Sequence, residues 1–147
     1  MDDVTRLTIQ SECARLMNQF SWAVDAMDYD AVVALFTPDC TFGRADVFYQ
    51  GHAGLRQSLN GRPRDRATRH VSSNMIIDVL DADTARGKAY CLVFGHRGAL
   101  SADGEAELNA PDSLILYTAE FRRTAEGWRI ARWHIGLSFR KRPAAAA

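Results

Sequence analysis

The segment FSWAVDAMDYDAVVALFTPDC, residues 20–40, decides how the first part of the chain is arranged. No glycine or proline occurs between residues 4 and 27, and apolar side chains recur there at helical spacing, which predicts a long amphipathic helix. Asp28 can accept hydrogen bonds from the free amide groups of a second, shorter helix. This second helix is expected to continue through Phe36 and to stop at Thr37 and Pro38. Two helices therefore precede the first strand.

The residues after this segment have the composition and spacing of β-strands. Two short strands are expected at residues 40–42 and 47–49, and a small helix at 52–59 ends near Gly61. Longer runs rich in β-branched, aromatic or aliphatic residues predict strands at residues 70–80, 85–97, 113–123 and 128–139. Helices followed by antiparallel strands predict an α+β fold, with the helices on one face of a curved sheet. The connection at residues 98–112 is long for a hairpin and is a candidate lid.

Length and composition predict one soluble domain. The chain has 147 residues, of which 47% are hydrophobic, so residues 1–140 suffice for one core, and residues 141–147 are expected to form a disordered tail. Eighteen basic residues balance eighteen acidic ones, which disfavours nucleic acid and anionic membranes as partners. The start of the chain is acidic and no apolar run reaches the roughly 20 residues of a spanning helix, so we expect a cytoplasmic protein. The three widely spaced cysteines are interpreted as buried thiols.

Several kinds of catalytic site are disfavoured by the motifs. No glycine-rich phosphate loop, dinucleotide fingerprint or nucleophile elbow occurs. The four histidines stand far apart, and none belongs to a metal-binding motif. We therefore expect neither a metal nor another cofactor.

The remaining candidates for chemistry are Asp25, His70 and His96. Strand alternation places His70, Ser72 and Asn74 on one face, which is polar for a core, so a pocket wall and a solvent-facing surface are both open interpretations. His96 closes an apolar row that is either a pocket wall or ordinary core. Asp25 points roughly 130° away from the apolar stripe of its helix, and periodicity alone predicts that it is exposed. The pattern therefore supports an acid–base pocket only as a hypothesis.

A family resemblance supports the hypothesis of an acid–base pocket. Residues 20–30 and the following LFTPDC, residues 35–40, resemble the opening of the SnoaL-like branch of the NTF2-like superfamily. GHAGL at 51–55, RHVSSN at 69–74, and FRR with EGWRI within 121–130 follow in the family's order. The resemblance implies a cystatin-like cone, in which a strongly bent sheet surrounds a hydrophobic cavity that the N-terminal helices close.

Within that superfamily the chain is similar to scytalone dehydratase and the lindane dehydrochlorinase type. The resemblance implies that Asp25 and His70 form a catalytic dyad and that His96 is a second catalytic histidine. A neutral imidazole can remove a proton beside a carbonyl or a leaving group, while the carboxylate fixes its tautomer. The implied function is a cofactor-independent lyase, dehydratase-like, acting on a small hydrophobic cyclic or polycyclic molecule.

The chain departs from these relatives at the tyrosine that polarises water. Val24 and Phe20 occupy the positions where relatives carry that phenol. Tyr49, Tyr117 or the pair Ser72 and Asn74 are candidates to replace it. The predicted substrate-binding residues are Phe20, Tyr29, Tyr49, Ser72, Asn74, Phe94, Tyr117 and Trp133.

Two other functions are kept open: a non-catalytic binding or assembly subunit, like the small subunit of ring-hydroxylating dioxygenases, and a ketosteroid-isomerase-like enzyme.

The arginines at positions 62, 64, 66 and 69 suggest an anion site, but Asp65 interrupts them, so a solvated loop is the favoured interpretation.

Apolar residues on both faces of the last two strands predict a homo-oligomer, a dimer or a trimer.

Overall fold

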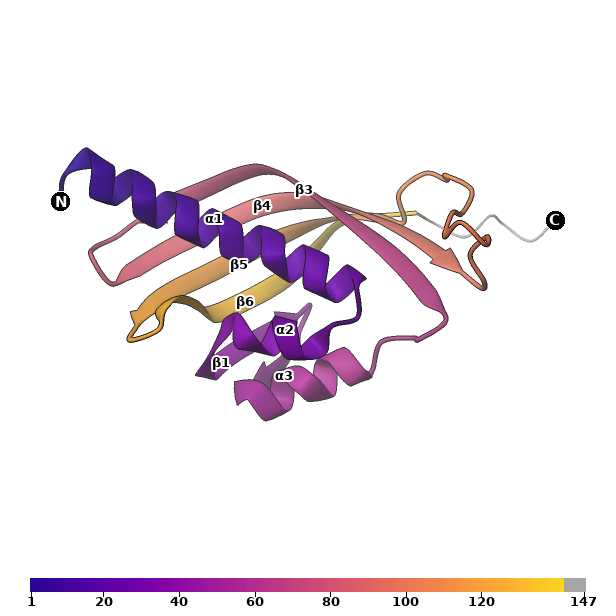
Figure 1. The fold of residues 1–147 in the computed structure, drawn as a ribbon, viewed down its shortest axis with the longest axis horizontal. Coiled ribbons are helices and arrows are strands. Elements are labelled where there is room, and N and C mark those ends of the chain that lie inside the picture. Colours follow the sequence, from indigo (N-terminus) through magenta and orange to yellow (C-terminus); the bar gives the residue numbers. More distant parts are fainter. Residues whose placement is uncertain (142–147) are drawn as a thin grey trace.

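The computed structural model describes residues 1–141 of the chain. Its elements are, in order, α1 (Asp3–Asp25), α2 (Tyr29–Ala34), β1 (Phe36–Arg44), β2 (Val47–Gln50), α3 (Gly51–Asn60), β3 (Arg66–Val79), β4 (Thr84–Arg97), β5 (Ser113–Thr124) and β6 (Gly127–Arg140). Figure 1 shows α1 lying across one face of the sheet, with α2 and α3 beside β1. The predicted α+β fold is confirmed. The predicted tail lies outside the described residues except for Lys141.

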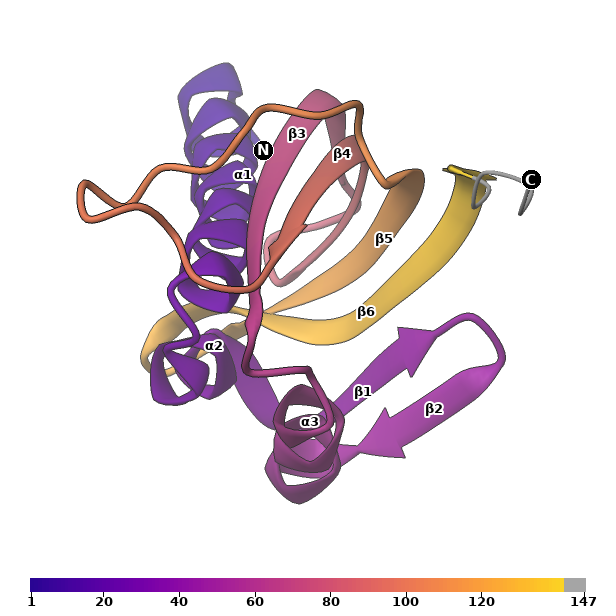
Figure 2. The same cartoon turned by 90° about the vertical axis from the view of Figure 1, so that its right-hand side faces the viewer.

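The six strands form one curved sheet in the order β2-β1-β6-β5-β4-β3. All neighbouring strands are antiparallel except β1 and β6, which are parallel. Figure 2 looks at the end of the molecule where β3 begins and where β4 and β6 end, and it shows how far β3 and β1 are rotated from one another. The face that α1 covers is called the inner face here.

The core lies between α1 and the inner face of the sheet. Asp2 caps α1 by accepting from the amide of Thr5, and Asp28 caps α2 by accepting from the amide of Ala31. Phe20 packs against Trp133 with ring centroids 4.3 Å apart, and Tyr117 lies 4.7 Å from the same indole. The three cysteines are buried and free, as predicted, and burial raises the pKa of the Cys13 thiol to about 12. The apolar stripe of α1 is buried at Ile9, Cys13, Leu16, Met17, Phe20 and Val24.

The second helix is shorter than predicted. It ends at Ala34, and the chain enters the sheet at once, because the carbonyl of Leu35 accepts a hydrogen bond from the amide of Ile130 at 2.9 Å. Pro38 is part of β1 and not a terminator before it. The pairing of β1 with β6 is irregular between Phe36 and Thr41, so the missing proline amide costs no ladder hydrogen bond.

A bulge in β3 changes which side chains face the core. The pairing with β4 shifts register between Ser73 and Ile76, and Asn74 has a φ of 52°. A bulge inserts one residue, so alternation reverses beyond it. Asn74 is exposed, whereas Ile77 is buried. The prediction that Asn74 shares the inner face with His70 is therefore wrong.

The outer face of the sheet carries an exposed apolar row. The strand register aligns Val71, Leu92, Leu114 and Phe139 across four strands, and Val71 and Phe139 are 50% and 70% exposed. The homo-oligomer stays a prediction that this row motivates. In the part of the chain that the structure describes, no helix is long and apolar enough to cross a membrane.

Candidate functional site

The site is built where the C-terminal end of α1 meets the start of β3. Asp25 is the last residue of α1, and its Oδ1 lies 2.6 Å from Nδ1 of His70. The backbone amide of His70 donates to Oδ2 of Asp25 at 2.8 Å, and the hydroxyl of Thr68 donates to Oδ1 at 2.7 Å. The side chains of His70 and Asp25 are 8% and 11% exposed. The predicted pair therefore exists as a buried contact.

Periodicity misplaced Asp25 because α1 buries a second flank. The stripe of the helix faces the inner side of the sheet, while its C-terminal turn also lies against β3, the last strand of the sheet. Three donors from β3 satisfy the carboxylate there, which offsets the cost of burying its charge. The prediction of an exposed Asp25 is wrong for this reason.

The carboxylate of Asp25 is held in its ionised form. Burial by itself would raise its pKa, but the hydrogen bond from His70 and the charge on His70 act in the opposite direction. The amide of His70 and the hydroxyl of Thr68 add to this effect, and the net pKa lies below the usual value of an aspartate. In the neutral tautomer of His70 that carries its proton on Nδ1, the ionised carboxylate accepts a hydrogen bond from Nδ1–H, and Nε2 keeps a free lone pair.

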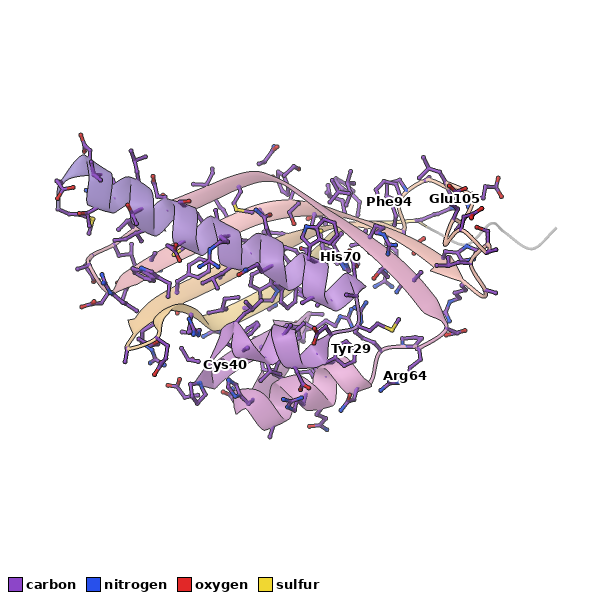
Figure 3. The ribbon with its side chains drawn as sticks, in the orientation of Figure 1. Tyr29, Cys40, Arg64, His70, Phe94 and Glu105 are labelled. Carbon is purple, nitrogen blue, oxygen red and sulfur yellow. The ribbon has the colours of Figure 1, made fainter. Side chains whose placement is uncertain are left out.

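His70 forms part of the wall of a cavity of about 1060 Å³. This volume lies just above the range for small-molecule pockets, about 300–1000 Å³. Figure 3 shows His70 near the C-terminal part of α1. Within residues 1–141, Nε2 of His70 has no hydrogen-bond partner. The apolar lining includes Phe20, Val24, Phe42, Val93, Ile115 and Ile135.

Tyr117 is the predicted phenol that reaches this cavity. Its side chain is 1% exposed, and burial raises its pKa well above the usual value, so it stays a protonated donor. Phe20 also lines the cavity, as predicted. Asp25, His70, Phe20 and Tyr117 are thus the sequence-predicted residues that the fold brings together.

His96 and Phe94 lie elsewhere. In β4 the odd-numbered residues from Ala85 to Val93 are buried and the even-numbered ones between them are exposed, so alternation places Phe94 and His96 on the outer face. Nε2 of His96 lies 3.3 Å from the carbonyl oxygen of Ala99 in the following loop. Phe94 pairs with Arg69 in the register of β3 and β4, next to His70, but its side chain is on the opposite face of the sheet. The prediction that these two residues belong to the site is wrong, because the strand turns their side chains away from it.

The other predicted binding residues pack or face solvent. Tyr29 and Tyr49 pack against the hydrophobic core, and Trp133 is wholly buried behind Phe20 and Tyr117. The hydroxyl of Ser72 lies 3.4 Å from that of Ser21. Among the described residues, none of these four side chains lines the cavity, and neither does Asn74 at the bulge.

Several polar residues of the cavity were missed or misjudged, among them Thr68 and three arginines. Thr68 lies two residues before His70, and strand alternation alone would have placed the two side chains on one face. Arg44 lines the cavity from the end of β1. Arg62 and Arg66 line it as well, so the solvated-loop interpretation is wrong for them, although Arg64 and Arg69 are exposed. Alternation in β3 places Arg66 on the face of Thr68 and His70 and Arg69 on the other, but no sequence signal separates Arg62 from Arg64 in the preceding loop.

The residues on either side of the loop at residues 98–112, Arg97 and Ser113, line the cavity. Only Asp112, at its end, lines the cavity among its residues, so the lid stays a prediction. Within residues 1–141, no three His, Cys, Asp or Glu side chains are grouped to hold a metal ion.

Known proteins share this architecture. The model of the SnoaL-like domain family matches residues 5–134. No curated protein sequence matches the chain. A candidate scytalone dehydratase from Novosphingobium aromaticivorans DSM 12444 superposes with a TM-score of 0.77, at 18% identity, over 99% of each chain. The hexachlorocyclohexane dehydrochlorinase LinA-type3 from Novosphingobium barchaimii LL02 gives 0.77 at 19% identity, over 99% of this chain and 97% of that one.

A third structure confirms the predicted type of fold. An NTF2-like protein with a cystatin-like fold from Novosphingobium aromaticivorans DSM gives a TM-score of 0.68 at 22% identity. The match covers 93% of this chain and 91% of that one. At these identities the likeness concerns the fold.

Proposed function

The chain belongs to the SnoaL-like domain family, and on that premise we propose that it is a cofactor-independent lyase of the dehydratase kind. Its proposed substrate is a small hydrophobic cyclic or polycyclic molecule that carries a leaving group beside an acidic C–H bond. The single observation that carries the proposal is the 2.6 Å contact between Asp25 and His70 in the wall of the cavity. The names of the similar dehydratase and dehydrochlorinase structures support the same class of reaction.

In the proposed mechanism, Nε2 of His70 removes a proton from the carbon next to a carbonyl group of the substrate. Asp25 holds the imidazole by Nδ1 and stabilises the imidazolium that forms. The electron pair of the broken C–H bond forms the new double bond as the leaving group departs. The leaving group takes its proton from the imidazolium of His70, and the protonated phenol of Tyr117 is the proposed hydrogen-bond donor to that group. The apolar walls strengthen each of these interactions by excluding water.

The test is turnover of a panel of hydroxylated cyclic ketones by the purified protein and its variants. Asp25→Asn and His70→Ala are each expected to lower kcat by about 10²–10⁴-fold, the usual contribution of acid–base catalysis. His96→Ala is the matched control, because this histidine lies on the outer face, and its kcat should stay unchanged. Turnover that survives both Asp25→Asn and His70→Ala would remove the pair from the mechanism.

The mass of the product separates the alternative functions. Elimination of water lowers the mass of the substrate, whereas a ketosteroid-isomerase-like reaction moves a double bond and leaves the mass unchanged. A non-catalytic binding or assembly subunit would bind panel members without converting any of them.

A further inference from the structure

The cavity contains a concentration of positive charge that the composition of the chain does not predict. The chain is neutral overall, yet Arg44, Arg62, Arg66, Arg97, Arg140 and Lys141 all line this one cavity. The carboxylates nearby are already engaged. Asp112 pairs with Arg66 at 2.8 Å, and Asp25 is bound by donors of β3. Among the residues that the structure describes, no carboxylate lies within 4.0 Å of the guanidinium of Arg44 or of Arg62.

Arg62 has unused capacity to donate hydrogen bonds. Its Nη2 donates to the hydroxyl of Thr68 at 3.1 Å, but its Nε is buried and has no partner within the described part of the chain. A buried donor without an acceptor is costly, and a charged one especially so. Arg44 is exposed at the end of β1 but lines the same cavity, and desolvation together with the positive charges of Arg62 and Arg66 lowers its pKa. A bound anion would give Nε of Arg62 an acceptor and would offset the positive charge around Arg44.

Arg62 is also connected to the proposed catalytic pair. Its guanidinium contacts the hydroxyl of Thr68, and that hydroxyl donates to the carboxylate that holds His70. An anion held by Arg62 would therefore lie at the same wall of the cavity as the imidazole. The apolar lining from Phe20 and Ile115 is left for the body of the ligand.

We propose that Arg44 and Arg62 bind an oxyanion of the substrate, so that the substrate is an apolar ring system bearing a carboxylate or phosphoryl group. This inference rests on the proposed function, since it names the substrate class of the same cavity. The planar guanidinium groups suit a carboxylate or a phosphoryl group because each presents paired donors. A neutral hydrophobic molecule would leave both arginines without a counter-charge.

The experiment measures the binding of three probes by isothermal titration calorimetry. 2-Naphthoate and 2-naphthamide share one apolar body and differ in charge, and 2-naphthyl phosphate tests the phosphoryl arm. 2-Naphthoate or the phosphate is expected to bind at least about tenfold more tightly than the amide, because charge-assisted hydrogen bonds are roughly twice as strong as neutral ones. The anion that binds more tightly identifies whether the site takes a carboxylate or a phosphoryl group. Higher salt should weaken the binding of both anions and leave the affinity for the amide unchanged.

Variants locate the site. Arg44→Gln and Arg62→Gln should each weaken the preferred anion by about tenfold and leave the amide unchanged. Arg64→Gln is the matched control, because Arg64 belongs to the same loop but is exposed and does not line the cavity. Circular dichroism confirms that each variant is folded. Arg44→Lys and Arg62→Lys keep the charge, and we expect them to retain part of the affinity.

Binding is measured without turnover, so this result is independent of the proposed reaction. His70→Ala should bind the anion as the unmodified chain does while losing catalysis. Equal affinity for the anions and the amide, no saturable binding of either anion, or full affinity in both glutamine variants would overturn the proposal. None of these outcomes would touch the proposed lyase activity, which the Asp25 and His70 variants test.

Discussion

The hydroxyl of Thr68 donates a 2.7 Å hydrogen bond to the same carboxylate oxygen of Asp25 that contacts the imidazole of His70. The amide of His70 occupies the other oxygen. All three donors belong to β3, so this strand fixes the orientation of the carboxylate before any ligand arrives. Residue spacing explains the arrangement, because positions two apart on a strand face the same side. Thr68 is therefore a positioning residue for the proposed dyad.

Replacing Thr68 with valine tests this positioning role. Thr68→Val keeps the shape of the side chain and removes the donor, so the imidazole loses part of its support. We expect kcat to fall about tenfold, since a hydrogen bond to a charged group contributes about 1.5–3 kcal/mol. Thr68→Ser retains the hydroxyl and should keep most of the activity. Steady-state kinetics with melting curves would check the result, and equal activity in the valine and serine variants would contradict it.

Because Asp25 is ionised in the folded chain, the free energy of unfolding should depend on pH under acidic conditions. Its pKa in the folded chain lies below the usual value of 3.8, so the unfolded chain binds its proton first as pH falls. The stabilisation is present above pH 3.8 and is lost as pH falls through the lower, folded pKa. Denaturant unfolding at several acidic pH values would measure this loss. The Asp25→Asn variant should show a shallower decline than the unmodified chain, whereas Asp103→Asn in the exposed loop should not.

The sequence specified the architecture well because periodic patterns report burial on one face. The stripe from Ile9 to Val24 predicted α1, and the alternating runs predicted the four long strands within a few residues. The mistakes occur where one residue changes the pattern. The bulge beside Asn74 reverses alternation in β3, and the irregular pairing near Pro38 admits a proline into β1.

The site was predictable only in part, because periodicity does not say which face of a strand is inner. The resemblance to relatives supplied Asp25, which the helix pattern had placed at the surface, and His70, which strand alternation had left open between a pocket wall and solvent. The same reasoning assigned His96, whose strand turns it to the outer face. Arg44 is far in sequence from Arg62, and only the folding of α3 against β1 brings them to one cavity.

The exposed apolar row on the outer face should form the contact between copies of this chain. Light scattering coupled to gel filtration is expected to give the mass of a dimer or a trimer. Val71→Lys and Leu92→Lys place a charge in the row, and we expect them to lower that mass, because burying an unpaired charge is costly. Trp22→Lys is the control, since Trp22 is 79% exposed on α1 and lies away from the row. If the mass falls only in the Trp22→Lys variant, the contact between copies is formed by α1 and not by the apolar row.

Removing the hydroxyl of Tyr117 tests the proposed donor to the leaving group. Tyr117→Phe keeps the aromatic ring, which packs at 4.7 Å from Trp133 and 6.0 Å from Phe20, so stability should change by no more than about 1 kcal/mol. Because burial holds the phenol in its protonated form, its loss removes a hydrogen-bond donor from the cavity. We expect kcat to fall about 10²-fold, with a smaller change in KM. Tyr90→Phe, on the outer face and 46% exposed, is the matched control. If both phenylalanine variants turn over substrate equally fast, Tyr117 does not stabilise the leaving group, and the Asp25–His70 pair is left as the acid–base machinery that the variants of those two residues test.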